Sequence, residues 1–393
     1  MTEKLYYLDS ELYEFAARVL DCRQEKAGWA VILDKTAFFP EGGGQLADTG
    51  TIGAVRVLDV QTRGDEILHY IDAPLEVGAE YLCRLDAAQR FRRMQNHSGE
   101  HILSGTIHAM SGADNVGFHM GAEFMTIDFS VELSWDELMQ AERTANAAVT
   151  ADLPIKTGFP TEEELKALDY RSKLELTENV RIVEIPGVDV CACCAPHLPS
   201  TGRIGLIKIL DAVRHRGGTR LSVVCGEDAL EKVREMQKGV TEVSRLLSAK
   251  RNEVAAAVER VLAQEQRLKE RVAELSMANA RMQADRISGC EGNICVFDSL
   301  LDDIALRELV NMLVEKCTGY AAVFTGSDEA GYRYIIGSRH VDLRAMSREI
   351  NSAIGGKGGG RPEMIEGRAS KTAAEIRNYV EKSTRLDKNG EIV

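Results

Sequence analysis

Residues 229–287 constrain the fold more than any other stretch of the chain. Apolar side chains recur there every seven residues, at Val240, Leu247, Val254, Val261, Leu268, Leu275 and Met282. Glycine is absent from 240 to 288 and proline from 200 to 361, so the pattern is typical of an uninterrupted helix. The second set of heptad positions mixes apolar and charged residues. We predict a long helix or helical hairpin that pairs two copies of the chain. Packing of the helix on its own domain is the alternative.

This segment separates parts of different character, and the predicted fold class is α+β multidomain. Residues 1–90 hold short β-type runs separated by glycine turns, which favours a small β-barrel. Residues 91–228 mix helices and strands, and residues 288–393 alternate between the two as in a compact α/β domain. We therefore predict four domains: 1–90, 91–228, the coiled-coil-like 229–287, and 288–393.

Several local elements follow from periodicity and capping. FRRMQNHSGEHILSGTIHAM reads as a helix over 91–110, and Ser134 with Glu137 forms a capping box that begins a second helix. Strands are predicted over 123–131, 179–185 and 202–213.

Composition limits the function classes. The chain is 44% hydrophobic and holds no run of about 18 apolar residues, so we expect a soluble protein without a membrane span. Its N-terminus lacks the apolar core of a signal peptide, which favours a cytoplasmic location. The net charge of −13, carried mostly by residues 1–228, argues mildly against a nucleic-acid partner. Two basic clusters, RFRR (90–93) and RHRGGTR (214–220), are nevertheless suited to phosphates.

Two pairs of metal-type donors stand far apart in the sequence. His97 and His101 lie four residues apart on the predicted helix, where two imidazoles on one face reach one ion. Cys193 and His197 form a C-x3-H pair about ninety residues later. Imidazole and thiolate are the donors that Zn²⁺ prefers. We predict a zinc site made of these four residues.

The sequence leaves details of this site open. Cys191 and Cys194 compete with Cys193 for the sulfur position, because all three lie in CACC. Three protein ligands and water would make a catalytic site, whereas four closed ligands would make a structural one. Glu100 stands beside the second histidine, unlike the glutamate of H-E-x-x-H proteases, and is not assigned as a base.

Four motifs together carry a family resemblance. NHSGEHILS (96–104) and CCAPHLPSTGRIGLIKI (193–209) resemble the editing module of alanyl-tRNA synthetase and of its free-standing relatives, the AlaX-type proteins. FFPEGGGQLADTG (38–50) is similar to their glycine-rich motif, and GGKGGGRPEMIEG (355–367) to a loop of the DHH-associated domain. The family's C-G-G-T-H appears here as Cys193-Cys194-Ala195-Pro196-His197. Motifs of an aminoacylation domain are missing, which implies the long free-standing form.

The resemblance implies hydrolysis of the ester between tRNA(Ala) and a wrong amino acid, serine or glycine, at a zinc site. A pocket shaped for alanine rejects these two poorly, so a second, sorting site is needed. Thr36 and Gln45 are suited to recognise the serine hydroxyl, with local turn capping as the alternative role. Gly42, Gly43 and Gly44 are expected to let the backbone approach the substrate closely.

The second glycine-rich run contains Lys357 and Arg361. It is not a Walker A loop, because Gly358 follows the lysine where Ser or Thr is required. A nest of backbone N–H groups with two cations suits an RNA phosphate, and the resemblance also points to tRNA contact. A surface loop without a ligand is the alternative.

Two further functions remain open at this point. Threonyl-tRNA synthetase carries a related zinc-spaced module, so editing of Ser-tRNA(Thr) is the second enzyme hypothesis. A non-catalytic RNA-binding protein with a structural zinc is the third, and it belongs to a different class.

Overall fold

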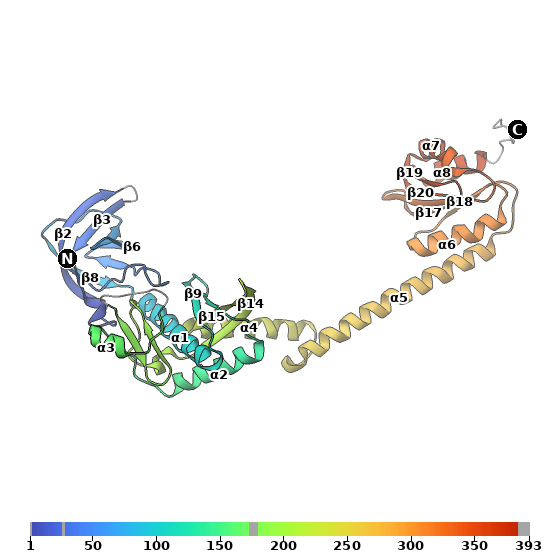
Figure 1. Cartoon of the computed structure of the whole chain (residues 1–393). Coiled ribbons are helices and arrows are strands. Elements are labelled where there is room, and N and C mark those ends of the chain that lie inside the picture. Colours follow the sequence, from blue (N-terminus) through green and yellow to red (C-terminus); the bar gives the residue numbers. More distant parts are fainter. Residues whose placement is uncertain (1, 26–27, 173–179, 384–393) are drawn as a thin grey trace. The chain divides into compact units, whose positions relative to one another are not determined.

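The computed structural model describes residues 2–25, 28–172 and 180–383 (Figure 1). The chain is a mixed α and β protein that divides into two compact units, Met1–Glu242 and Val243–Val393. The predicted boundaries at 90, 228 and 287 lie inside these units and stay predictions. Asn179, the first residue of the predicted strand 179–185, lies outside the described residues. None of the helices in the described part has the length and apolar character needed to cross a membrane.

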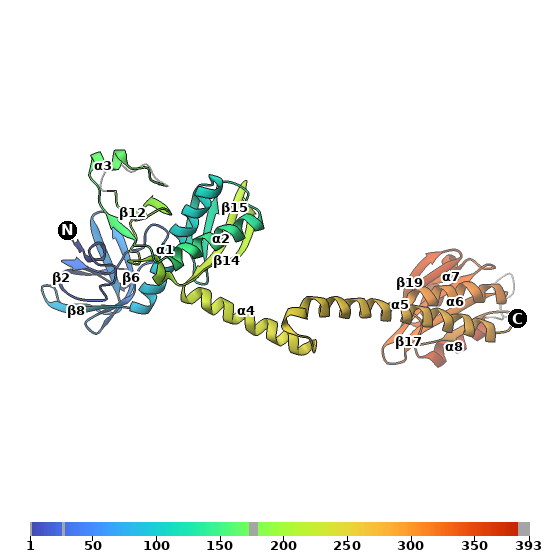
Figure 2. The ribbon, with the colours of Figure 1, turned by 90° about the horizontal axis from the view of Figure 1, so that it is seen from below.

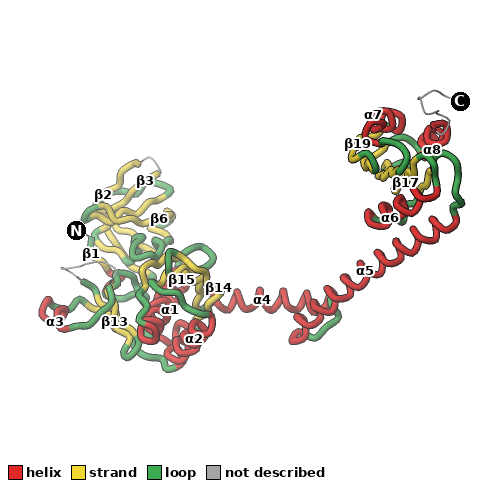
Figure 3. The backbone as a smooth tube through the Cα atoms, turned by 45° about the vertical axis from the view of Figure 1, so that its right-hand side comes forward, coloured by secondary structure: helices red, strands yellow, loops and turns green. Residues whose placement is uncertain are grey.

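The first unit begins with a closed barrel of antiparallel strands in the order β2-β3-β7-β6-β5-β8, the barrel that the sequence predicted (Figure 3). The strands are β2 (Glu14–Glu25), β3 (Gly28–Leu33), β5 (Gly50–Ile52), β6 (Val55–Arg63), β7 (Glu66–Ile71) and β8 (Glu80–Leu85). Phe15, Ala17 and Val19 of β2 are buried while their neighbours are exposed, because successive side chains of a strand face opposite sides. Two short strands, β1 (Glu3–Lys4) and β4 (Lys35–Thr36), pair with each other.

Helix α1 (Ala87–Ser111) follows the barrel and contains the predicted helix 91–110. Asp86 accepts a hydrogen bond from the Gln89 N–H at its start, and Gly112 in the left-handed region ends it. Helix α2 (Trp135–Thr150) begins with the predicted capping box of Ser134 and Glu137. The two helices pack side by side (Figure 2).

Both helices pack on a four-stranded sheet with the order β14-β15-β10-β9. Its strands are β9 (Asn115–Met120), β10 (Met125–Phe129), β14 (Ile207–His215) and β15 (Gly218–Cys225). The predicted strand 202–213 is wrong in its first part: Thr201–Ile204 is a 3-10 turn, and Gly205 with a φ of 85° precedes β14. A small sheet of β11 (Lys156–Gly158), β12 (Ile182–Ile185) and β13 (Asp189–Ala192), with the short helix α3 (Glu162–Ala167), completes this region.

The predicted helical segment is two helices, α4 (Glu227–Leu246) and α5 (Val254–Arg286). Ser248 has a φ of 49°, and the Ala249 N–H bonds to the Ser244 carbonyl, which ends the first helix as a left-handed cap does. The seven-residue stripe stays exposed along α5, where Leu268 is 58% exposed. The end of α5 behaves differently, because Ala280 and Ala284 are buried in the core of the second unit.

The second unit is a compact α/β sandwich around a sheet with the order β16-β17-β18-β20-β19. Its strands are β16 (Ile294–Phe297), β17 (Tyr320–Ser327), β18 (Gly331–Ser338), β19 (Gly356–Arg361) and β20 (Met364–Ala369). One face packs against the end of α5 and α6 (Asp303–Leu313), and the other against α7 (Leu343–Ile354) and α8 (Ala373–Lys382).

Candidate metal centre

The four predicted metal donors lie together in the first unit. Helix α1 presents His97 and His101 one turn apart, and the loop after β13 supplies Cys193 and His197. The possible ligand atoms of the four residues all lie within 4.8 Å of one another. Cys193 Sγ is 3.4 Å from Nε2 of His97 and 3.4 Å from Nε2 of His197. Folding thus unites two pairs that the sequence holds about ninety residues apart.

Two of the imidazoles are held in place through their Nδ1 atoms. His97 Nδ1 lies 2.9 Å from Gln45 Oε1, which only accepts, so the ring carries its proton on Nδ1. His101 Nδ1 lies 3.0 Å from Asp189 Oδ2 in the same way. Arg171 in turn donates to both oxygens of Asp189, at 2.8 and 2.9 Å, and keeps this carboxylate charged. Both Nε2 lone pairs are therefore free to face a metal.

The third imidazole has an equivalent support. His197 Nδ1 is 3.2 Å from Ser98 Oγ, which also accepts from the Leu198 N–H at 3.2 Å. Each histidine thus uses Nδ1 for a protein partner and leaves Nε2 for the centre. Outer partners of this kind fix the tautomer and orientation of metal-binding histidines.

The donor set fits zinc. Zn–N and Zn–S bond lengths place neighbouring ligand atoms of a tetrahedral site about 3.6 Å apart, close to the observed sulfur–nitrogen distances. Burial alone would raise the pKa of the Cys193 thiol, but the surrounding imidazoles hold that pKa well below its usual value. A thiolate is the form that binds metal. Cys193 is also the one member of the set that is partly exposed.

The geometry separates the three candidate sulfur atoms. Cys193 Sγ is the one that meets His97 and His197. Cys194 is exposed, and its Sγ lies 3.3 Å from where a Cβ on Gly43 would be. Cys191 is buried in a second grouping with His101 and Asp189, whose atoms also lie within 4.8 Å of one another. This supports the preference for Cys193.

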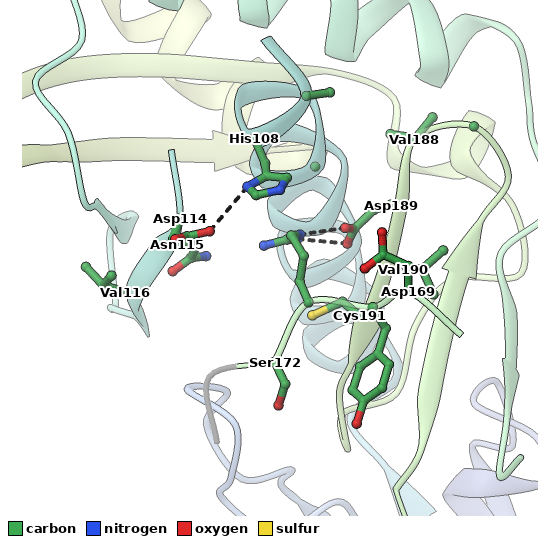
Figure 4. A pocket seen from close by; sticks show the side chains of 15 residues that line it. His108, Asp114, Asn115, Val116, Asp169, Ser172, Val188, Asp189, Val190 and Cys191 are labelled. Carbon is green, nitrogen blue, oxygen red and sulfur yellow. Dashed lines mark hydrogen bonds and ion pairs between the residues drawn. The ribbon is translucent and has the colours of Figure 1, made fainter. Parts of the chain in front are cut away.

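A pocket of about 810 Å³ borders the Asp189 side of the centre (Figure 4). It is lined by α1 at Gly105 and His108, by β9 at Asn115, and by Asp189 and Cys191 of the β13 hairpin. The four donors are not among its lining residues. A Cβ on Gly105 would lie 2.5 Å from the Val188 carbonyl oxygen, so glycine here lets the hairpin bring Asp189 up to the helix.

Glu100 is not placed to act as a free base. Its side chain is buried, and Oε1 accepts from Ser104 Oγ at 2.7 Å and from the Asn115 amide. Glu100, to which the sequence assigned no role, thus holds α1 to β9.

The PEGGGQ turn reaches the centre through Gln45, whose side chain is fully buried. Gly42 and Gln45 exchange both backbone hydrogen bonds, at 3.0 and 3.1 Å. A Cβ on Gly44 would lie 2.5 Å from Phe118 Cδ1, so this glycine lets the turn dock on β9. The observed close approach is thus to protein. Approach of Gly42, Gly43 and Gly44 to a substrate stays a prediction.

Thr36 lies inside the barrel rather than at the four donors. Its Oγ1 is 2.8 Å from His69 Nε2 and accepts from the Phe38 N–H at 3.1 Å. His69 Nδ1 donates to the Val31 carbonyl at 3.1 Å, so Nε2 accepts the threonine proton. Burial lowers the pKa of His69 to about 4. Within the described residues no hydrogen bond links Thr36 to the donors, and sequence reasoning missed His69.

The second glycine-rich run is an edge strand, not a nest. Residues 356–361 form β19, whose one partner among the described strands is β20. A nest needs alternating left-handed residues, whereas only Gly355 of residues 355–361 has a positive φ. Lys357 and Arg361 are exposed and, four residues apart, lie on one face of the strand. Lys357 stands opposite Arg368 of β20.

The RFRR cluster makes mainly structural contacts, and its contact with phosphates stays a prediction. Arg90 is 1% exposed, and its Nε donates to both oxygens of Asp48 at 2.9 and 3.0 Å. Arg93 bonds the Ala47 carbonyl, and Arg92 pairs with Asp228. These arginines join α1 to the barrel loop and to the start of α4.

Known proteins resemble the chain along nearly its whole length. The family model "Threonyl and Alanyl tRNA synthetase second additional domain" matches residues 180–241, and the DHHA1 domain matches 291–385. The alanyl-tRNA editing protein AlaX-L of Pyrococcus horikoshii is 28% identical over 96% of both chains. The alanine–tRNA ligase of Natronomonas pharaonis is 33% identical over 93% of this chain and 42% of its own, and that of Pyrococcus abyssi 31% identical over 98% and 44%.

This chain thus spans about two fifths of each ligase. It matches the editing protein over 96% of both chains, with both domain types present and the four donors of the sequence motifs in one cluster. The chain is thus similar, over nearly its whole length, to an alanyl-tRNA editing protein of the AlaX-L type.

Proposed function

We propose that the protein is a zinc-dependent deacylase that hydrolyses Ser-tRNA(Ala), and also Gly-tRNA(Ala), in trans. The matched relatives are an alanyl-tRNA editing protein and alanine–tRNA ligases. The observation that carries the proposal is the convergence of the four donors, each histidine fixed through Nδ1. In the reaction, water adds to the ester carbonyl carbon, the bond to the ribose oxygen breaks, and serine and free tRNA leave.

His97, His101, Cys193 and His197 would hold the zinc. The ion would supply Lewis-acid polarisation of a substrate carbonyl or of water. Gln45 adds a donor of its own, because its buried Nε2 has no hydrogen-bond partner among the described residues. An unsatisfied buried N–H costs roughly 1–3 kcal/mol, which a substrate oxygen would recover on binding. We therefore assign Gln45 both the orientation of His97 and a contact to the acyl group.

Thr36 is proposed to recognise the serine side chain. Its proton is committed to His69, so its remaining lone pair can only accept. A serine hydroxyl can donate there and the methyl group of alanine cannot. A site built on such a hydrogen bond discriminates more strongly than a site built on size.

The second unit is proposed to hold tRNA and the α5 stripe to pair two copies. Lys357 and Arg361 are exposed cations that suit RNA phosphates. In filter-binding titrations, Lys357→Ala should weaken tRNA(Ala) binding and lower the salt slope by about one. Lys238→Ala, an exposed lysine on α4, is the matched control. Equal slopes in both variants would contradict the contact.

The decisive test is release of radiolabelled serine from purified Ser-tRNA(Ala). Ala-tRNA(Ala) and Ser-tRNA(Thr) are parallel substrates, each with and without a zinc chelator. We expect chelator-sensitive release from Ser-tRNA(Ala) with alanine spared. Preferred release from Ser-tRNA(Thr) would instead support the second enzyme hypothesis, since the matched domain's description names both synthetases.

One observation favours a different class of function. Four protein donors are enough to close a tetrahedral zinc site, as in structural zinc sites. In that case the protein would bind RNA without hydrolysing it. Stoichiometric zinc and tRNA binding, with no release from any of the three substrates, would establish this alternative.

A further inference from the structure

A row of aromatic side chains leads from the barrel core to the surface beside the metal centre. Tyr6 is buried and packs edge-on against Phe39, with ring centroids 5.4 Å apart. Tyr7 packs against Tyr6 at 4.6 Å and is only partly buried. Phe159 packs against Tyr7 at 5.3 Å and is 52% exposed. The row thus ends in an open aromatic ring.

Arg181 ties this row to the loop that carries the thiol donor. Its Nη1 donates to the carbonyls of Cys193 and Ala195, at 3.0 and 2.8 Å. The same guanidinium lies 5.3 Å from the centroid of the Tyr7 ring, a cation–π contact. Arg181 therefore links Tyr7 to the loop that carries the donor Cys193.

A second cation, Lys4, lies beside the ring of Tyr7. Lys4 is exposed, and its Nζ lies 5.8 Å from the centroid of Tyr7. Exposed aromatic rings flanked by cations are the features with which proteins bind single-stranded nucleic acid, because bases stack on rings while cations meet the backbone. A double helix could not use them in this way, since its bases are already stacked.

We propose that Tyr7 and Phe159, with Lys4, form a stacking site for the unpaired 3′-terminal nucleotides of the tRNA substrate. The inference rests on the proposed function, because the terminal ribose must carry the ester to the metal centre. A base on Phe159 holds the end of the strand, and Lys4 contacts a phosphate of the same unpaired segment. The site positions the RNA and leaves the bond-breaking step to the metal centre.

The test uses the full-length protein and an unacylated RNA minihelix that ends in CCA, with 2-aminopurine as the terminal base. Stacking quenches 2-aminopurine fluorescence, so the signal reports on the end of the strand alone. Phe159→Leu removes the ring and keeps apolar volume, and Phe159→Trp restores a ring. Phe124→Leu, at a phenylalanine that is 38% exposed on the β9–β10 turn, is the matched control.

We expect quenching with the wild type, Phe159→Trp and Phe124→Leu. In Phe159→Leu we expect the quenching to be lost and the affinity to fall about 5- to 150-fold, the range for one stacked base. Lys4→Gln should lower the salt slope by about one. Quenching that is absent with the wild type, or equal in Phe159→Leu, overturns the proposal.

Deacylation, measured separately, keeps the two ideas apart. Release of serine by the wild type without Phe159-dependent quenching would contradict the stacking site and leave the proposed function intact. Phe159-dependent quenching without hydrolysis of any substrate would support the site and refute the deacylase.

Discussion

His69 provides the sharpest test of the barrel interior, because its burial makes stability depend on pH. The pKa of this imidazole is about 4 in the folded protein, against 6.5 for an exposed histidine. Between these values the unfolded chain binds a proton that the folded chain refuses, so the free energy of unfolding falls as the pH falls. The contribution is fully present above pH 6.5 and is lost toward pH 4. At pH 5 the loss from this one group is about 2 kcal/mol.

The assay is urea unfolding followed by tryptophan fluorescence at pH 8 and pH 5, with a chelator present throughout. The chain has two tryptophans, Trp29 in β3 and Trp135 in α2, so the signal reports on the first unit. His69→Gln keeps an acceptor for Thr36 and removes the titration. The variant should lose about 2 kcal/mol less than the wild type on acidification. His108→Gln, at a partly exposed histidine, is the control and should follow the wild type. Parallel losses in His69→Gln and the wild type would refute the reasoning.

Three further outcomes follow from the structure. Asp189→Asn should weaken the affinity for Zn²⁺ or Co²⁺ about 10- to 100-fold, because it removes the charge that orients His101. Unchanged affinity in a competition titration would show that Asp189 does not support the metal site. Cys193→Ser should abolish metal binding and deacylation, whereas Cys191→Ser should keep one zinc per chain, as measured by mass spectrometry. The reverse pattern would reassign the sulfur ligand to Cys191. Leu268→Glu should convert a dimer to a monomer in sedimentation, because it places a charge in the exposed stripe, whereas an unchanged mass would remove α5 from the interface.

Local patterns in the sequence predicted the elements that depend on near neighbours. The Ser134–Glu137 capping box and the one-turn spacing of His97 and His101 are settled within four residues, so sequence alone fixes their geometry. Joining this pair to Cys193 and His197 needed the chemistry of the donors, because no local rule links residues so far apart.

The supporting residues were beyond sequence reasoning because their partners are set by packing. Asp189 meets His101 only because a glycine on α1 admits the β13 hairpin, and a lone aspartate two residues before CACC gives little signal. His69 on β7 meets Thr36 on β4, 33 residues earlier in the sequence. For the glycine run at 355–360, the composition predicted a left-handed nest, which is wrong. Pairing with β20 holds the run in an extended strand, and this pairing partner could not be read from the local sequence.

The edge strand β19 affects how readily the protein self-associates at high concentration. Among the described strands, β19 lies at the edge of its sheet, and four of its six residues are glycines, which have no side chain to hinder an incoming strand. An exposed edge strand of this kind can pair with a strand of another chain, which leads to aggregation. Lys357 and Arg361 flank Gly358, Gly359 and Gly360, so two such edges repel each other before their backbones can pair. The two positive charges therefore oppose strand addition at this edge, and concentrated salt, which screens them, would make the protein more prone to self-association.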